Sequence, residues 1–234
     1  MSSVHNCAGE IRHAIVSGEI SVGARLPAER ALAERFGVNR VTVRGALARL
    51  ESEGLLDVRQ GSGYTVRRWR RTGGPELVST LVSLARTAKD RNAILGDLLL
   101  VRRQLARSVL GQLAKRGVAE AEVEAIERAV ERLATLAESR APAREIAEAD
   151  LDVASAVVDA TKSTVLALCM NPVAQLLVEL PALQAAMFRA PEENVLGWRA
   201  LVAWIRGGCS KSGLERIADA LEDRDGKTRK ALER

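Results

Sequence analysis

The sequence is poor in aromatic residues, in cysteine and in long apolar runs, and each of these shortages argues against one class of protein. Aromatic residues make up only 3% of the 234 residues, so the core must be built from Ala, Leu and Val. Such a core suits packed helices better than a sandwich of sheets. The three cysteines, Cys7, Cys169 and Cys209, lie far apart and form no Cys-x-x-Cys pair. This pattern favours a reduced, cytoplasmic protein whose cysteines are packing residues.

No run of about 18 apolar residues is present, so no membrane span is expected. The segment Met1–Cys7 lacks a charged region followed by an apolar stretch, and it is not predicted to be a signal peptide. Apolar residues make up 47% of the chain and charged residues 28%, which is an ordinary globular balance. The length allows one large domain or two modest ones.

Positive charge is concentrated in the first third of the chain. Residues 1–72 contain twelve Arg, no Lys and seven acidic residues, which gives the whole formal net charge of +5. Residues 73–234 are neutral overall. A basic region releases counterions when it neutralises phosphates. The asymmetry is therefore consistent with nucleic-acid binding, although an ordinary solvated surface without a binding function could carry the same charge excess.

The basic third shows three helical patterns. Apolar residues at helical spacing predict helices over about 4–17, 28–36 and 40–52. Pro27 is expected at the start of the second helix, where its missing N–H costs nothing. Asn39 is expected to cap the third helix. A short helix, a tight turn and a longer helix predict a helix-turn-helix.

The third predicted helix has an apolar side and a basic side. Val43, Ala46, Leu47 and Leu50 form its buried stripe, and Arg40, Thr42, Arg44 and Arg49 lie opposite. Arg at the start of such a helix bonds guanine with two hydrogen bonds, and Thr contacts a thymine methyl or a phosphate.

Two short alternating segments follow, over 55–58 and 64–66, joined by the Gly-rich turn 59–63. They predict a two-stranded wing whose glycines let the backbone approach a phosphate or the minor groove. Arg67, Arg68, Arg70 and Arg71 come next. They either add backbone contacts or form a solvated linker.

These segments together resemble the GntR-family winged-helix domain. The resemblance covers about 60 residues, including Leu26-Pro27-Ala28-Glu29-Arg30 and Arg59-Gln60-Gly61-Ser62-Gly63. In that family the matching positions contact DNA. The resemblance therefore implies these contact residues: Arg30, Asn39, Arg40, Thr42, Arg44, Gln60 and Gly61. Asn39 stands where Ser or Thr is commoner and Val41 where Thr is common, so the operator is expected to differ.

Gly73-Gly74-Pro75 marks a boundary. We therefore expect a DNA-binding domain over 1–72 and an effector-binding and dimerisation domain over 73–234. The second domain shows no convincing strand. Helices are predicted over 75–89, 93–116, 119–138, 142–161, 163–188, 191–207 and 211–234. Pro172 and Pro181 predict that the helix over 163–188 is bent or split. The expected fold is mainly α, with an antiparallel bundle of about six to seven helices after the winged helix.

A helical domain after this wing resembles the FadR-type branch of the family. Many members of that branch hold a divalent metal through one Asp and three His. Asp150 matches the Asp, but Ala154 stands at one His position and Arg199 at about the next. His5 and His13 lie in the first domain. We therefore expect no metal and no cofactor.

Metal-free members of this branch include regulators that respond to fatty acyl-CoA. The segments 98–102 and 186–192 resemble theirs. A fatty acyl-CoA or fatty acid needs an apolar tunnel and cations, for which Arg102, Arg103 and Arg199 are candidates. Alternatively, Arg102 forms a buried salt bridge with a helix such as that of Asp150.

The expected function is that of a homodimeric transcriptional regulator that binds a palindromic operator of double-stranded DNA and responds to a small molecule. The alternatives are another organic acid as effector, or a constitutive DNA-binding protein without one. No Ser/His/Asp or Cys/His set lies outside the first domain, and no phosphate-binding Gly loop occurs. An enzyme is therefore not expected.

Overall fold

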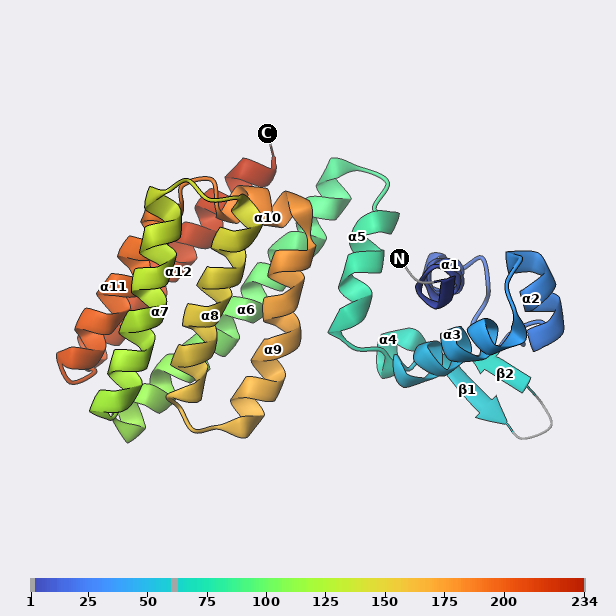
Figure 1. Cartoon of the computed structure of the whole chain (residues 1–234), viewed down its shortest axis with the longest axis horizontal. Helices are drawn as coiled ribbons and strands as arrows, with labels where there is room; N and C mark the ends of the chain where they lie inside the picture. Colours follow the sequence, from blue (N-terminus) through green and yellow to red (C-terminus); the bar gives the residue numbers. More distant parts are fainter. Residues whose placement is uncertain (1–2, 60–62, 234) are drawn as a thin grey trace. The chain divides into compact units, whose positions relative to one another are not determined.

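The computed structural model describes residues 3–59 and 63–233. The elements are α1 (Ser3–Ser17), α2 (Glu29–Phe36), α3 (Arg40–Ser52), β1 (Leu56–Arg59), β2 (Gly63–Val66), α4 (Trp69–Thr72), the 3-10 helix η1 (Pro75–Leu77), α5 (Val78–Leu84), α6 (Ala88–Arg116), α7 (Glu120–Glu138), α8 (Ala143–Asp159), α9 (Thr164–Glu179), α10 (Pro181–Met187), α11 (Pro191–Arg206) and α12 (Lys211–Leu232) (Figure 1). They form two compact units, Met1–Arg86 and Thr87–Arg234.

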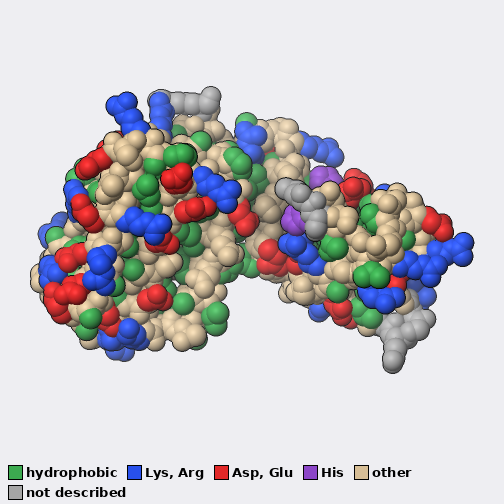
Figure 2. Space-filling model, viewed as in Figure 1, with side chains coloured by type: hydrophobic (Ala, Val, Ile, Leu, Met, Phe, Trp, Pro, Cys, Tyr) green, Lys and Arg blue, Asp and Glu red, His purple; other side chains and the backbone are tan. Residues whose placement is uncertain are grey.

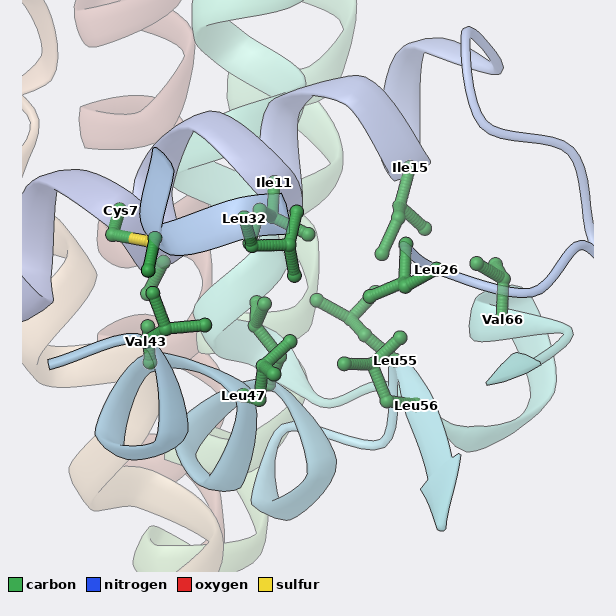
Figure 3. Close-up of a cluster of buried hydrophobic side chains, with 14 of the residues drawn as sticks. Cys7, Ile11, Ile15, Leu26, Leu32, Val43, Leu47, Leu55, Leu56 and Val66 are labelled. Carbon is green, nitrogen blue, oxygen red and sulfur yellow. The ribbon is translucent and has the colours of Figure 1, made fainter. Parts of the chain in front are cut away.

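The N-terminal unit is built around one apolar core. Ile11 and Ile15 of α1, Leu32 of α2 and Leu47 of α3 point into it (Figure 3). Leu55 and Leu56, at the start of the wing, close it from the other side and are fully buried. Burying one such side chain contributes about 1.5–3 kcal/mol, so this core fixes α3 against α1 and α2.

Local signals set the ends of the two central helices. Gly37 ends α2 in the left-handed conformation, with φ of 62°, which glycine adopts at little cost. Asn39 then caps α3, because its side chain accepts a hydrogen bond from the Thr42 backbone N–H at 2.8 Å. The expected helix-turn-helix is confirmed. Pro27 lies one residue before the cap of α2, Ala28, and so precedes the helix instead of starting it.

The wing is an antiparallel pair in which Leu56 pairs with Val66 and Val58 with Tyr64. The loop before α2 runs along the other edge of β2, where the N–H of Leu26 donates to the Tyr64 carbonyl at 2.9 Å. This loop holds β2 from the side opposite β1. The predicted turn residues Gln60 and Gly61 lie outside the described residues.

The N-terminal unit extends beyond residue 72. Residues 69–72 form the short helix α4 where a linker was one expectation, and α5 packs against α1. The division between the units therefore falls after Arg86, and the expected boundary between residues 72 and 73 lies inside the first unit. Gly73, Gly74 and Pro75 indicated a turn at this point. A turn is weaker evidence for a domain boundary than packing is, and here the following helix, α5, packs against α1.

The second unit is an all-helical bundle, and seven helices, α6 to α12, belong to the part of it that the structure describes. α7 packs between α8 and α11, while α6 packs against α9 and α12. The expected split of 163–188 is found at Pro181, where α9 and α10 meet at 91°. Pro172 stays inside α9. In the described chain no single helix is long and apolar enough to cross a membrane, although the bent pair α9 and α10 passes that test jointly.

Candidate nucleic-acid interface

The N-terminal end of α3 is the exposed, basic part of the helix-turn-helix. Val43 and Leu47 anchor the other side of α3 in the core with no exposed surface. Arg40 and Arg44 are exposed, and Thr42 is half-buried. The predicted reading residues of α3 therefore share its solvent side. This is the geometry with which a recognition helix enters a major groove.

Arg44 is held in place by an acidic residue of α2. Its Nη2 donates to Glu29 Oε2 at 2.9 Å and its Nε to Glu29 Oε1 at 3.3 Å. Hydrogen bonds from Arg44 lower the pKa of Glu29, so the carboxylate stays ionised at neutral pH. The Arg44 side chain is 68% exposed, and exposed pairs contribute only about 0–1 kcal/mol. Glu29 can therefore orient Arg44 and release it to a guanine or phosphate at little cost.

Arg30 lies on the same helix as Glu29 and is also paired, with Nε 3.0 Å from Glu34 Oε1. The side chains of this pair are 74% and 67% exposed. Figure 2 shows basic side chains gathered over α2 and the β2 end of the wing. Arg30 thus directly follows in α2 the residue, Glu29, that pairs with Arg44. The contacts expected of Gln60 and Gly61 stay predictions.

A second group of charged residues is buried inside the helical unit. Arg102 of α6 donates from Nη2 to Asp225 of α12, and Arg103 Nη1 lies 3.5 Å from the other oxygen of Asp225. Asp225 is 2% exposed. Arg102 therefore forms the buried salt bridge that was the alternative to effector binding, with α12 as its partner and not the helix of Asp150.

Asp150 has two other neighbours. Trp198 Nε1 donates to Asp150 Oδ1 at 2.7 Å. Arg224 Nη2 lies 3.9 Å from the same oxygen, which is an ion pair but too long for a hydrogen bond. Burial lowers the pKa of Arg224, and the carboxylates of Asp150 and Asp225 oppose that shift. Within the described residues, four buried donors have no hydrogen-bond partner, namely Arg102 Nε, Arg224 Nε and Nη2, and Asn194 Nδ2. The acceptor Asp225 Oδ2 has none either, so these buried residues leave both donors and an acceptor unused.

Arg199 is not part of this cluster. It is exposed, and its Nη2 lies 3.3 Å from Glu131 Oε2 on α7. It lines an open depression of about 450 Å³ together with Glu127 and Glu131. The residue of α11 that reaches Asp150 is the preceding one, Trp198. Among residues 3–59 and 63–233, no group of three or more His, Cys, Asp or Glu side chains is placed to hold a metal ion.

Comparison with known proteins bears on the N-terminal unit. Residues 5–66 match the family model described as bacterial regulatory proteins, gntR family. The N-terminal unit carries a GntR-family winged helix-turn-helix domain. The chain is similar to the HTH-type transcriptional regulator Mce2R of Mycobacterium tuberculosis, with 48% identity over 68 residues, which cover 29% of this chain and 28% of that protein.

Two further comparisons cover more of the chain. A fatty acid metabolism regulator protein of Vibrio cholerae is 35% identical over 96 residues, which cover 41% of this chain and 34% of that protein. A solved structure described as Lar, which controls expression of the agr system of Listeria monocytogenes, superposes with a TM-score of 0.64. That match covers 100% of this chain and 97% of the other at 14% identity, so it shows the fold alone.

Val41, noted above as standing where Thr is common, is 78% exposed at the start of α3. Sequence reasoning missed one buried pair. Arg224 and Asp225 of the helical unit were not singled out. Ala218, Asp225 and Thr228 share the buried side of α12, and their spacing of seven and three residues could have placed Asp225 inside the bundle.

Proposed function

We propose that this chain is a sequence-specific DNA-binding transcriptional regulator that acts as a homodimer on a palindromic operator and is modulated by a small anionic ligand. The observation that carries the DNA-binding part is the exposed start of α3, where Arg40 and Arg44 project from a helix whose other side is locked in the core. The concentration of all the net positive charge in residues 1–72 supports it.

In this proposal the first turn of α3 lies in the major groove. Arg40 and Arg44 bond guanine or phosphate, and the exposed methyls of Val41 contact a thymine methyl. Asn39 and Thr42 keep the turn in register through their capping hydrogen bond. Arg30 contacts the backbone, while Gln60 and Gly61 of the wing approach the minor groove.

Replacing Arg44 tests the interface. Arg44→Ala should weaken binding to the DNA upstream of the chain's own gene by about 10-fold to 100-fold, because one good base contact contributes about 1–3 kcal/mol. The matched control is Arg128→Ala, which removes an exposed Arg paired with Glu124 in the helical unit. Fluorescence anisotropy at several salt concentrations measures both variants. Equal affinities for the two variants, or no preference of the parent chain for its own upstream DNA over random DNA, would refute the proposal.

The anionic effector is proposed from the buried cluster. Three guanidiniums, those of Arg102, Arg103 and Arg224, lie within 4 Å of the carboxylates of Asp150, Asp225 and Glu222. A ligand carboxylate would accept hydrogen bonds from Arg224 Nε and Asn194 Nδ2, which have no hydrogen-bond partner in the described structure. A fatty acid or fatty acyl-CoA is the first candidate, since a relative is named a fatty acid metabolism regulator. Another organic acid is the second candidate.

Arg102 keeps a proposed role in this binding through its position in the cluster. Arg199 is proposed as a less favourable site for an anion, because the depression that it lines is also lined by the carboxylates of Glu127 and Glu131. An acyl-CoA phosphate could reach Arg199 there only by displacing Glu131.

Thermal shift measurements with a series of fatty acids, their CoA thioesters and short organic acids test the effector. A binding ligand should raise the melting temperature, and Arg224→Leu should abolish that rise while circular dichroism confirms a folded variant. No shift with any compound, together with unchanged DNA affinity, would favour a constitutive DNA-binding protein. A rise in melting temperature that persists in Arg224→Leu would show that the ligand binds at a different site.

A further inference from the structure

Almost all of the excess positive charge of the chain lies in a few residues that follow the wing. Residues 1–66 contain eight Arg and seven acidic residues, which leaves a net charge of only +1. Residues 67–71 add four Arg and no acidic residue, and so carry +4 of the formal net charge of +5. We call these four arginines the post-wing cluster: Arg67, Arg68, Arg70 and Arg71. The family model matches residues 5–66, so the cluster lies just outside the matched domain.

The side chains of the post-wing cluster are exposed and have no acidic partner. All four residues are exposed, and within residues 3–59 and 63–233 none of them forms an ion pair. Other arginines of the same unit are paired, as Arg12 is with Glu53 and Arg44 with Glu29. Unpaired like charges this close together repel one another. The cluster therefore does not stabilise the fold, and an external anion would relieve its repulsion.

The cluster is held on a fixed support and not on a loose linker. The Thr72 hydroxyl at the end of α4 donates to the Gly54 carbonyl at 2.6 Å, which ties α4 to the end of α3 (Figure 1). Trp69 packs against the apolar core. The Arg70 guanidinium lies 4.4 Å from the centre of the Trp69 ring, within the range of a cation–π contact. The charges therefore keep a defined place relative to α3.

The position of the cluster at the end of α3 indicates which anion it meets. α3 has 13 residues and so spans about 20 Å, whereas the major groove of B-DNA is about 12 Å wide. When the first turn of α3 lies in the groove, its last turn therefore extends past the edge of the groove, where the phosphates lie. The end of the recognition helix contacts the backbone in this way in homeodomains. An acidic protein would also suit four guanidiniums, but DNA is the polyanion that α3 itself brings to them.

We propose that the post-wing cluster binds phosphates of the DNA that flanks the bases contacted by α3. This deepens the proposed function, on whose DNA binding it rests, by assigning the sequence-independent part of the affinity to residues that follow the winged helix. Each arginine that neutralises a phosphate releases counterions, so this contribution weakens as the salt concentration rises. Phosphates carry no base identity. The cluster therefore adds affinity for any sequence, while Arg40 and Arg44 supply the preference for the operator.

Salt titrations of the full chain, followed by fluorescence anisotropy, test the cluster. The variant Arg67→Gln/Arg68→Gln/Arg71→Gln removes three charges and leaves Arg70 stacked on Trp69. Each phosphate contact contributes about 0.9 to the slope of log K against log salt concentration, so the slope should become shallower by about 2–3. The affinities for the DNA upstream of the chain's own gene and for random DNA should fall by the same factor, at least about 10-fold at about 0.1 M salt.

Two controls separate charge from structure. Arg140→Gln/Arg189→Gln/Arg216→Gln removes the same charge from three exposed positions of the helical unit, and it should leave the slope unchanged. Replacing the same three arginines of the cluster by Lys should also keep the slope, because an ammonium binds a phosphate as a point charge. Circular dichroism checks that all three variants are folded.

The outcomes separate this proposal from the proposed function. If the parent chain prefers its own upstream DNA and the Gln variant of the cluster keeps the parent slope, the cluster does not bind DNA. That result would favour an acidic protein as its partner and leave the DNA-binding proposal intact. A Lys variant with a slope as shallow as that of the Gln variant also overturns the inference, because charge would then not be what the cluster supplies. A parent chain without any DNA preference refutes the proposed regulator, and the slopes on random DNA still decide whether the cluster binds phosphates.

Discussion

Gly54 shows how a single residue determines the join between α3 and the wing. Its φ is +72°, and a Cβ built on it would lie only 2.0 Å from the Thr72 carbonyl oxygen. The Thr72 hydroxyl donates to the Gly54 carbonyl at 2.6 Å. The close approach of α4 to the end of α3 therefore requires glycine here, both for its conformation and for its missing side chain.

We predict that Gly54→Ala destabilises the N-terminal unit by more than about 1–3 kcal/mol, which is the cost of the left-handed conformation alone, because the clash with backbone atoms adds to it. Thermal denaturation of the full chain measures the change. Gly111→Ala is the control, since Gly111 lies in α6 with nothing within 4 Å of the built Cβ. It should be neutral or stabilising by up to about 1 kcal/mol. Equal effects of the two substitutions would contradict this account of Gly54.

At the scale of elements, Glu122 ties the start of α7 to two other segments. It accepts hydrogen bonds from the Ala119 N–H at 2.9 Å and from Arg116, at the end of α6. Lys162, in the turn before α9, lies 3.0 Å from it. Hydrogen bonds from Arg116, then from the Ala119 backbone and Lys162, lower the pKa of Glu122 to about 2.

The lowered pKa gives a pH dependence with a definite sign. The carboxylate stabilises the fold above the ordinary pKa of 4.5, and this contribution is lost as the pH falls toward about 2. We predict that Glu122→Gln lowers stability at pH 7 by about 1 kcal/mol, or about 2–4 °C. The difference from the parent chain should vanish between pH 4.5 and about 2. The control Glu124→Gln removes a carboxylate from an exposed pair with Arg128, and it should change stability and its pH dependence little. A stability difference for Glu122→Gln that does not depend on pH would refute the assignment.

The two prolines of the region 163–188 show when a local sequence signal is enough to predict the end of a helix. Pro181 starts α10 after a sharp bend, as its missing N–H predicts. Pro172 carries the same local signal, yet α9 continues through it. The carbonyl that loses its partner belongs to Leu168, which is 66% exposed, so water can replace the missing hydrogen bond. The sequence could not distinguish these two prolines because the difference lies in their surroundings.

On the scale of the whole molecule, the two units have separate cores. Leu47 of α3 and Leu133 of α7 are each completely buried, and they belong to different units. Units with separate cores need not unfold in one transition.

Calorimetry of two core variants tests this independence. Leu47→Ala should destabilise the N-terminal unit by about 2–5 kcal/mol and leave the transition of the helical unit unchanged. Leu133→Ala should do the reverse. One shared transition that both substitutions lower alike would show that the units unfold together.

The sequence by itself determined the winged helix-turn-helix and the helical nature of the rest. Periodicity placed the helices, while Gly37, Asn39 and Pro181 fixed ends that depend only on neighbouring residues. It also identified the side of α3 on which Arg40 and Arg44 lie. These features are local, because caps, turns and helix faces follow from residues a few positions apart.

Only the tertiary structure decided which distant residues meet. It paired Arg102 with Asp225, brought Trp198 and not Arg199 to Asp150, and extended the N-terminal unit to Arg86. Such contacts depend on how helices cross, and a helix face in the sequence does not specify its partner. For the same reason the sequence of α9 did not specify which of its apolar side chains are buried, and packing left Val165 and Leu168 exposed.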